Sequence, residues 1–263
     1  MSRWIVCPKR RRNSTPITKW GCSWASSSRS EGFPIHVPNQ CLDAGGKRKS
    51  DRTETGMPTS PEGTRRVRRR WDRKARLYDL LTAPAERMMG LARGRAWVFR
   101  RVPRGRVLVV GAGTGKNLSY YPEGARVIAT DLSSGMLARA MEKVAGSPEN
   151  VRFVVTDAED LAFKDGVFDR IVVTCVFCSV PDPVRGLREV RRVLRPGGEV
   201  VLLEHMRPGG LLGRLFDLLD PIMSRLMGPH INRRTPDNIS KAGLQLVEER
   251  NVFSDWVKVI VAR

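Results

Sequence analysis

Three glycines alternate with other residues in the stretch VLVVGAGTGKNL, residues 107–118, which begins as an aliphatic run and continues into a helix-compatible segment. Glycine permits a tight strand-to-helix turn and lets the backbone approach a bound ligand closely. Loops of this kind bind a nucleoside triphosphate, a nicotinamide or flavin dinucleotide, or S-adenosylmethionine. The residues at fixed positions around the glycines distinguish these three ligands.

The loop departs from both phosphate-binding patterns. A triphosphate loop has glycine five positions before its Gly-Lys pair and Ser or Thr directly after that pair, where this chain has Val110 and Asn117. The dinucleotide pattern has a third glycine where this chain has Lys116. We therefore expect a ligand that brings no phosphate to this loop, and we expect Lys116 to be an ordinary residue of the first helical turn.

Acidic residues end the two strands that are expected to follow the loop. Asp131 is placed to accept hydrogen bonds from both hydroxyls of a ribose, and Asp157 with Ala158 is placed to read an adenine edge. A plain tight turn and two helix caps are the alternative explanation. The coincidence of all three features at strand ends favours the ligand site.

Strands alternate with helix-compatible stretches, which predicts a parallel sheet covered by helices on both faces. We expect five such strands, at residues 105–110, 126–131, 151–157, 169–176 and 199–205. Two further strands, 244–252 and 256–262, flank a short turn and are expected to pair antiparallel. The predicted fold is α/β and Rossmann-like, with a seven-stranded, mainly parallel sheet and an antiparallel last strand.

Helices are expected at 116–121, 134–146 and 184–194, the last of them broken at Pro196-Gly197-Gly198. One or two helices, interrupted at Pro84, are expected before the sheet. Four parts follow from these patterns. Residues 1–63 are predicted to be a disordered basic tail, with Met57 as an alternative start; 64–104 to hold N-terminal helices; 105–206 to form the ligand-binding core; and 207–263 to hold a helical lid insertion and the last two strands.

Charge and cysteine content limit the compartment and the partners. Lys and Arg number 47 against 27 Asp and Glu, a net charge of +20, and residues 1–74 carry 18 of the basic and 6 of the acidic residues. Such a segment attracts polyanions, which are nucleic acid or an anionic membrane surface. Five irregularly spaced cysteines indicate a reducing compartment, and no stretch reaches the ~18 apolar residues of a membrane span. We expect a cytoplasmic protein that is at most peripheral to a membrane.

At this point a resemblance becomes specific. The stretches VLVVGAGTGKNL, TDLSSGMLARA, TDAEDLAF, FDRIVVTCVFCSVPDP and REVRRVLRPGGEVVLLEH resemble, in order and spacing, the class I S-adenosylmethionine methyltransferases of the ubiquinone/menaquinone-methylating type, the type 11 group. This resemblance covers residues 104–205. The stretch GPHINRRTPDNISKAGL is similar to a segment of the phospholipid N-methyltransferase and thiol-methylating relatives.

The resemblance implies S-adenosylmethionine as the cofactor and assigns residues to each part of it. Gly111, Gly113 and Gly115 would line the methionine moiety. Asp131 would bind the ribose, and Met136 would pack on the adenine. Asp157 and Ala158 would recognise the adenine amine, and Tyr78 would close over the cofactor.

Methyl transfer from a sulfonium needs positioning and exclusion of water, with a base only for a protonated acceptor. Candidate bases are His205, which follows the fifth strand, and His230 in the lid; a structural hydrogen-bonding role is the alternative for His205. Candidate acceptor-binding residues are Cys178, Ser179, Asn232 and Arg233, the last of which is alternatively part of a structural ion pair. No second ligand pair accompanies Cys175-x-x-Cys178, so we expect no metal.

The apolar stretch LLGRLFDLLDPIMSRLMG is predicted to form an amphipathic lid helix that Pro221 kinks or divides. Its apolar side either packs on the cofactor domain or forms an entrance for a hydrophobic or membrane-resident acceptor, compatible with interfacial docking. The oligomeric state stays open.

The leading hypothesis is a methyltransferase for a small or lipid-like hydrophobic acceptor, namely a phospholipid amine, a quinol carbon or a thiol. A nucleic-acid methyltransferase recruited by the basic tail is the first alternative. The stretch TCVFCSV stands where amino-methylating members of that class carry an Asn- or Asp-Pro-Pro-aromatic motif, which makes nucleic acid an unlikely partner. A non-catalytic cofactor-binding module is the second alternative.

Overall fold

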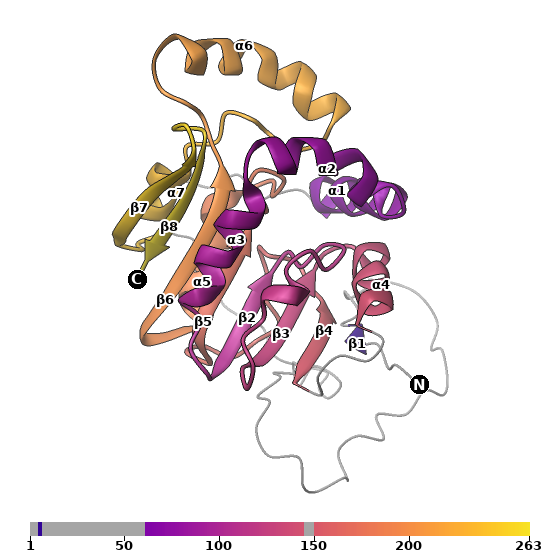
Figure 1. The fold of residues 1–263 in the computed structure, drawn as a ribbon, viewed down its shortest axis with the longest axis vertical. Coiled ribbons are helices and arrows are strands. Elements are labelled where there is room, and N and C mark those ends of the chain that lie inside the picture. Colours follow the sequence, from indigo (N-terminus) through magenta and orange to yellow (C-terminus); the bar gives the residue numbers. More distant parts are fainter. Residues whose placement is uncertain (1–4, 7–60, 145–149) are drawn as a thin grey trace, which may run out of the picture.

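The computed structural model describes residues 5–6, 61–144 and 150–263. Its centre is a twisted sheet in the strand order β1-β4-β3-β2-β5-β6-β8-β7 (Figure 1). The strands are β1 (Ile5–Val6), β2 (Arg106–Val110), β3 (Arg126–Asp131), β4 (Val151–Val155), β5 (Phe168–Thr174), β6 (Leu194–His205), β7 (Leu246–Phe253) and β8 (Val257–Ala262). All seven predicted strands are present.

The pairing of the strands also agrees with the prediction. Strands β4, β3, β2, β5 and β6 run parallel to one another, and β8 pairs antiparallel with both β6 and β7. The Rossmann-like, mainly parallel sheet with a reversed edge is therefore confirmed. The two-residue strand β1 pairs parallel with Val154 and Val155 at the opposite edge.

Helices cover both faces of this sheet. On one face the buried side chains of α3 (Leu91–Arg100) and α4 (Ser134–Lys143) join those of alternate strand residues such as Val107 and Val109. On the other face α5 (Pro183–Val193) and α7 (Thr235–Lys241) pack with the intervening residues, such as Leu108. Because both faces are buried, the central strands are continuous aliphatic runs rather than alternating ones.

Side-chain caps start the two helices that follow β3 and β5. The hydroxyl of Ser133 accepts a hydrogen bond from the backbone N–H of Met136, and a carboxylate oxygen of Asp182 accepts one from Arg185. Each cap satisfies a backbone donor that the first helical turn leaves unpaired. Both helices therefore begin directly at the carboxyl end of the sheet.

Three helices precede the sheet, α1 (Pro61–Lys74), α2 (Tyr78–Met88) and α3, where one or two were predicted. The prediction that Pro84 interrupts the helical pattern is wrong, because Pro84 lies inside α2. The break lies at Gly90, whose left-handed φ of 64° separates α2 from α3. Glycine adopts that conformation without the steric cost that other residues meet.

Other boundaries differ from the predicted ones. The stretch 116–121 forms only the single 3-10 turn η1 (Leu118–Tyr120). Helix α5 ends at Val193, before Pro196-Gly197-Gly198, and β6 already begins at Leu194, with a register shift against β5. The lid helix α6 (Gly210–Leu226) continues through Pro221 and is not divided by it.

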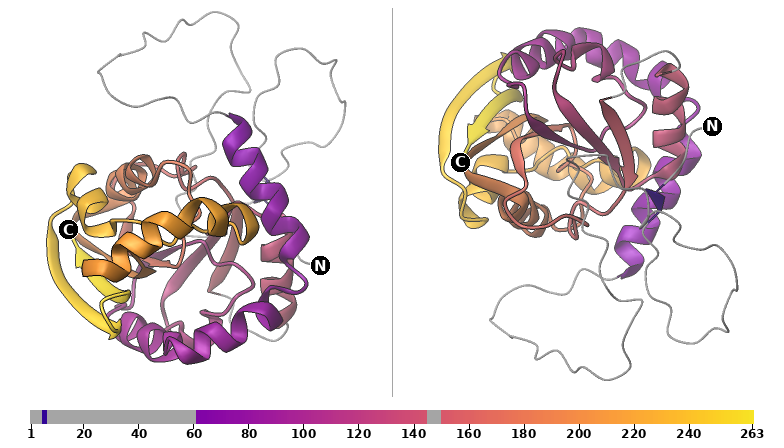
Figure 2. Two further views of the ribbon diagram at one scale, coloured as in Figure 1. Left: turned by 90° about the horizontal axis from the view of Figure 1, so that it is seen from above. Right: turned by 90° about the horizontal axis from the view of Figure 1, so that it is seen from below.

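The lid lies over the carboxyl ends of the strands. Seen from above, α6 crosses that end of the sheet and α1 runs along its side (Figure 2). Among the described helices, none is both long and apolar enough to cross a bilayer. The predictions for a disordered tail at 1–63 and an alternative start at Met57 fall outside the described residues, except that 5–6 form β1 and 61–63 belong to α1.

Candidate active site

A cavity of about 530 Å³ opens at the carboxyl ends of β2, β3, β5 and β6. This is the edge at which parallel α/β sheets bind ligands, and the volume lies in the range of small-molecule sites. Helices α1 and α2 and the segment after α6 complete its walls. Ten of the predicted site residues line it: Tyr78, Gly111, Gly113, Asp131, Met136, Asp157, Ala158, Cys178, Ser179 and His205.

The three glycines of the loop after β2 all have left-handed backbones but face different surroundings. A Cβ on Gly111 would lie 2.2 Å from a methyl carbon of Val176, and one on Gly115 would lie 2.5 Å from Leu118. A Cβ on Gly113 would meet no atom within 4 Å. Gly113 therefore leaves open space beside the cavity, whereas Gly115 does not line the cavity and serves close packing.

Asp131 joins the glycine loop to the start of α4. One carboxylate oxygen accepts a hydrogen bond from the Gly113 amide at 2.9 Å, and the other accepts one from the Ser133 amide at 2.8 Å. Burial raises the pKa of Asp131 to about 6, and the nearby carboxylate of Asp72 adds to the increase. Each carboxylate oxygen has a second lone pair, so Asp131 retains acceptor capacity for hydroxyls.

The residues predicted for the adenine lie together at the next strand ends. Met136 is almost fully buried in the first turn of α4, and Asp157 and Ala158 follow β4. A carboxylate oxygen of Asp157 accepts a hydrogen bond from the Glu159 amide at 3.0 Å, which fixes the turn. The cavity therefore has an apolar sulfur side chain and a polar strand end in the places that the sequence indicated.

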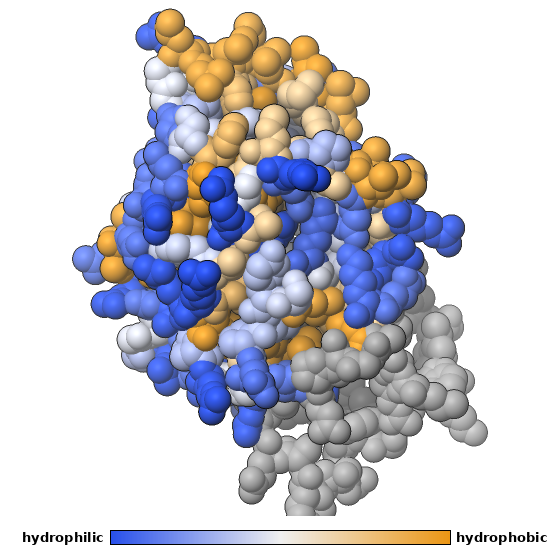
Figure 3. All heavy atoms as spheres, viewed as in Figure 1, coloured by the Kyte–Doolittle hydropathy of each residue, from blue (hydrophilic) through white to orange (hydrophobic). Residues whose placement is uncertain are grey.

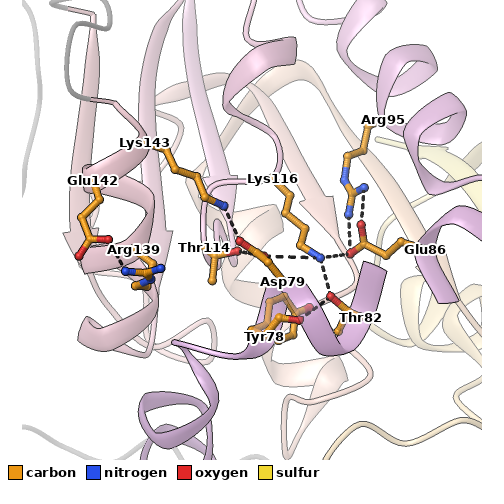
Figure 4. A network of polar contacts seen from close by, with 10 residues as sticks. All are labelled: Tyr78, Asp79, Thr82, Glu86, Arg95, Thr114, Lys116, Arg139, Glu142 and Lys143. Carbon is orange, nitrogen blue, oxygen red and sulfur yellow. Dashed lines mark hydrogen bonds and ion pairs between the residues drawn. The ribbon is translucent and has the colours of Figure 1, made fainter. Parts of the chain in front are cut away.

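A polar network fastens α2 to the glycine loop (Figure 4). Lys116 donates to Glu86 at 2.7 Å, and Arg95 forms two hydrogen bonds with the same carboxylate, at 3.0 and 3.2 Å. The Thr114 hydroxyl donates to Asp79 at 2.5 Å. The interpretation of Lys116 as an ordinary helical residue is wrong, because it lies in a turn and its ammonium group joins this network.

Tyr78 lies at the start of α2 as part of the same wall. Its ring packs edge-on against Trp71 with the centroids 5.7 Å apart, and the ammonium of Lys116 lies 4.8 Å from the ring centroid. Burial raises the pKa of the Tyr78 phenol, which therefore stays protonated. Trp71 and Tyr78 are thus held as an aromatic wall by packing and a cation–π contact.

Sequence reasoning missed several polar residues that line the cavity: Thr82, Glu86, Arg95 and Asn117. The Asn117 side-chain oxygen and the Arg95 Nε are buried without a hydrogen-bond partner. Unpaired buried polar atoms are costly, roughly 1–3 kcal/mol each, so such atoms at a cavity wall fit a polar ligand. The sequence signal was weak for Thr82, Glu86 and Arg95, which stand neither in the glycine loop nor at a strand end, and Asn117 was used only to exclude a triphosphate loop.

The loop after β5 is held by Glu204, which sequence reasoning also missed. One Glu204 carboxylate oxygen accepts hydrogen bonds from the amides of Val176 and Phe177, at 2.8 and 3.1 Å. Burial raises the pKa of Glu204 to about 7. Burial likewise raises the pKa values of Cys175 and Cys178, so both thiols stay protonated and are poor nucleophiles.

Of the four candidate catalytic and acceptor-binding residues in the lid and after β6, one lines the cavity and three do not. His205 lines the cavity, its Nδ1 is buried without a partner, and burial lowers its pKa to about 4. His230, Asn232 and Arg233 do not line the cavity. Their polar groups contact the protein instead: His230 Nδ1 lies 2.8 Å from Asp220, Asn232 donates to Asp217, and Arg233 donates to the Val180 carbonyl.

Comparison with known proteins identifies the core. Residues 108–202 match the type 11 family described as a methyltransferase domain. The core of this chain is therefore similar to S-adenosylmethionine-dependent methyltransferase domains. The resemblance found in the sequence is thereby confirmed, and S-adenosylmethionine is the cofactor of this class. The open space at Gly113, the carboxylate of Asp131 and the unpaired Asn117 oxygen and Arg95 Nε fit that polar, flexible molecule.

Three curated relatives are named for different activities. A demethylmenaquinone methyltransferase from Clavibacter sepedonicus is 32% identical over 58% of this chain and 63% of its own length. A phosphatidylethanolamine N-methyltransferase from Cereibacter sphaeroides is 44% identical over 38% of this chain and 51% of its own length. A human thiol S-methyltransferase is 41% identical over 38% and 42% of the two chains. The chain therefore spans less than two thirds of these relatives.

A solved structure extends the likeness of the fold. The [4+2]-cyclase SpnF superposes with a TM-score of 0.61 at 18% identity, covering 80% of this chain and 98% of its own. This protein is named as a cyclase and not as a methyltransferase. The fold by itself therefore does not specify the reaction.

The role of Asp131 is tested by Asp131→Asn. We expect S-adenosylmethionine affinity to fall about 10- to 100-fold, because a hydrogen bond to a charged group contributes roughly 1.5–3 kcal/mol. In the unchanged protein the affinity should fall as the pH drops through about 6, where Asp131 becomes protonated. Calorimetry measures both effects, with NAD as the control ligand and the exposed Asp237→Asn as the control variant. Full affinity in Asp131→Asn contradicts the ribose role, and tight NAD binding contradicts the site assignment.

The glycines are tested as a matched pair. Gly111→Ala should lower the free energy of unfolding by roughly 2–4 kcal/mol, because its methyl would meet Val176 in a left-handed backbone. Gly113→Ala should cost only about 1–2 kcal/mol of stability but should weaken S-adenosylmethionine binding at least ~10-fold, because its methyl would occupy open space beside the cavity. Urea unfolding and calorimetry measure the two quantities. Unchanged affinity in Gly113→Ala would show that the ligand does not approach this loop.

Proposed function

We propose that this chain is an S-adenosylmethionine-dependent methyltransferase that acts on a small or lipid-like hydrophobic acceptor. The observation that carries the proposal is the composition of the cavity wall. The strand ends supply the polar groups, and the opposite wall is largely apolar. This wall comes from α1, α2 and the segment after α6. Its apolar residues are Val67, Trp71, Leu81, Ala85, Met89, Met227 and Pro229, and the same helices add Lys74, Tyr78, Thr82 and Glu86.

When bound, S-adenosylmethionine supplies a methyl group that is activated by the sulfonium. The chain's own residues then have to orient the two reactants and exclude water. Asp131 would hold the ribose, and Met136 and Asp157 would hold the adenine. Gly113 and Asn117 in the loop after β2 and Arg95 on α3 border the cavity and would contact the amino-acid part.

The acceptor class stays a choice among three. The relatives' names point to a quinone ring, a phospholipid amine and a thiol. All three are consistent with an apolar wall facing a polar reacting atom. A reducing compartment such as the cytoplasm is part of the proposal and is consistent with the free thiols of Cys175 and Cys178.

Of the two candidate bases, His205 is the one that borders the cavity. A pKa of about 4 makes its imidazole neutral and only weakly basic near pH 7. We therefore propose that His205 orients the acceptor through a hydrogen bond. His230 is assigned a positioning role, because its backbone N–H donates to the Cys178 carbonyl at 2.8 Å and its ring contacts Asp220.

The acceptor is identified by incubating the protein with methyl-labelled S-adenosylmethionine and separate lipid, quinol, thiol and RNA pools. We expect label in one of the first three pools and none in RNA, because the cavity wall is apolar. The Asp131→Asn protein serves as the control for cofactor-dependent transfer. Label in RNA alone would favour a nucleic-acid methyltransferase, and tight cofactor binding without transfer to any pool would favour a non-catalytic module.

The assignment of His205 is tested with the accepting pool. His205→Gln should lower kcat/KM about 10-fold, the size expected for one lost hydrogen bond, and should leave S-adenosylmethionine affinity unchanged. The pH profile of kcat between pH 6 and 8 should have the same shape in His205→Gln as in the unchanged protein, because His205 titrates below that range. His230→Gln is the matched comparison. A larger loss of kcat/KM in His230→Gln than in His205→Gln would reverse the two roles.

A further inference from the structure

Helix α6 exposes its apolar side to solvent. Only Gly213 and Asp220 are buried along its 17 residues. The most exposed apolar residues of α6 recur every three or four positions and therefore lie along one side of the helix: Leu211, Leu215, Leu218, Ile222 and Leu226. An amphipathic helix of a globular protein usually turns such a stripe toward the core. In α6 the apolar stripe faces solvent instead.

Helix α2 adds to the exposed apolar area. It contains no buried residue, and Leu77, Leu80, Leu81 and Met88 on and beside it are all more than half exposed. Figure 3 shows apolar side chains gathered over α6 at the top of the molecule. We call the exposed apolar residues of α6 together with these four the α2–α6 apolar surface. Exposed apolar residues gathered in this way mark an interaction site.

The surface adjoins the entrance of the active-site cavity. Leu81 belongs to both, since it is exposed on α2 and also lines the cavity. Met227, which directly follows α6, is 60% exposed and lines the cavity as well. The apolar surface therefore reaches the cavity at Leu81 and Met227.

A cationic helix is fixed beside this surface. The sequence of α1, PEGTRRVRRRWDRK, has seven basic and two acidic residues. Arg70 donates to the Ser224 carbonyl at 3.2 Å and Lys74 donates to the Met227 carbonyl at 2.8 Å, so α1 binds the carboxyl end of α6. Arg66, Arg69 and Arg73 remain exposed.

We propose that the α2–α6 apolar surface docks onto an anionic lipid bilayer, with α6 lying in the plane of the interface and α1 contacting the headgroups. Apolar side chains that enter the interface and basic residues that approach it each contribute favourably, the latter by about 1 kcal/mol apiece. A second copy of the chain fits less well, because pairing the surface with itself would bring two cationic α1 helices together. Nucleic acid would match α1 but would leave the apolar stripe in water.

The proposal is tested by flotation of the full chain with vesicles. We expect flotation with equal parts of phosphatidylcholine and phosphatidylglycerol, weaker flotation with phosphatidylcholine alone, and release at high salt. The double variant Leu215→Glu/Leu218→Glu should lose at least ~10-fold in vesicle affinity. The matched control is Val247→Glu on β7, because Val247 is 47% exposed and Leu215 is 48% exposed; it should float like the unchanged protein.

A charge variant tests the contact between α1 and the anionic headgroups. Arg66→Glu/Arg69→Glu should lower affinity for the anionic vesicles and should leave the weak binding to phosphatidylcholine unchanged. Thermal unfolding and S-adenosylmethionine calorimetry on every variant confirm that the fold and the cofactor site are intact. Because flotation needs neither cofactor nor acceptor, its result is independent of the proposed methyl transfer.

Three results would overturn the proposal. The first is an unchanged protein that stays in the dense fraction with anionic vesicles. The second is a Leu215→Glu/Leu218→Glu protein that floats as well as the unchanged protein. The third is no flotation together with a dimer in sedimentation velocity that this double variant dissociates, which would assign the surface to contact between copies of the chain.

Discussion

The organisation of this site depends on one carboxylate, that of Asp131, which accepts hydrogen bonds from two backbone amides. Asp131 receives the Gly113 amide on one oxygen and the Ser133 amide on the other. The end of β3 is thereby fastened to the loop after β2 and to the start of α4. These contacts favour the charged carboxylate, yet burial outweighs them and raises its pKa to about 6. The residue that would bind a ribose is therefore also the one that holds the loop in place.

A second set of contacts controls the outer wall of the cavity. Glu86 receives both Lys116 and Arg95, which fastens α2 to the glycine loop (Figure 4). Arg70 and Lys74 connect α1 to the end of α6. Cationic side chains at a helix carboxyl terminus are favoured by the unpaired carbonyls and the helix dipole. Polar contacts therefore join α1 to α6, and a separate polar network joins α2 to the glycine loop and α3.

The sequence predicted the sheet and many of the residues that line the cavity, because both depend on short-range patterns. Aliphatic runs that end in Asp131 or Asp157 identify parallel strands together with their functional edge. The orientation of α6 was not predictable in the same way, because periodicity shows that a helix has an apolar side but not which way that side faces. Glu86 and Glu204 were missed because their partners lie about 30 positions away along the chain. The break at Gly90 was missed because Pro84 was the stronger sequence signal, although α2 continues through it.

The shallow burial of α6 has a consequence for the dynamics of the entrance. A helix that buries only Gly213 and Asp220 has few apolar contacts to lose when it opens. Local unfolding of such an element costs much less than global unfolding, so its amide hydrogens exchange early in water. The entrance of the cavity is then bordered by a helix with few buried contacts, while the Asp131 loop beneath it is held by two amide hydrogen bonds. Local opening of this helix would widen the entrance and leave the sheet unchanged.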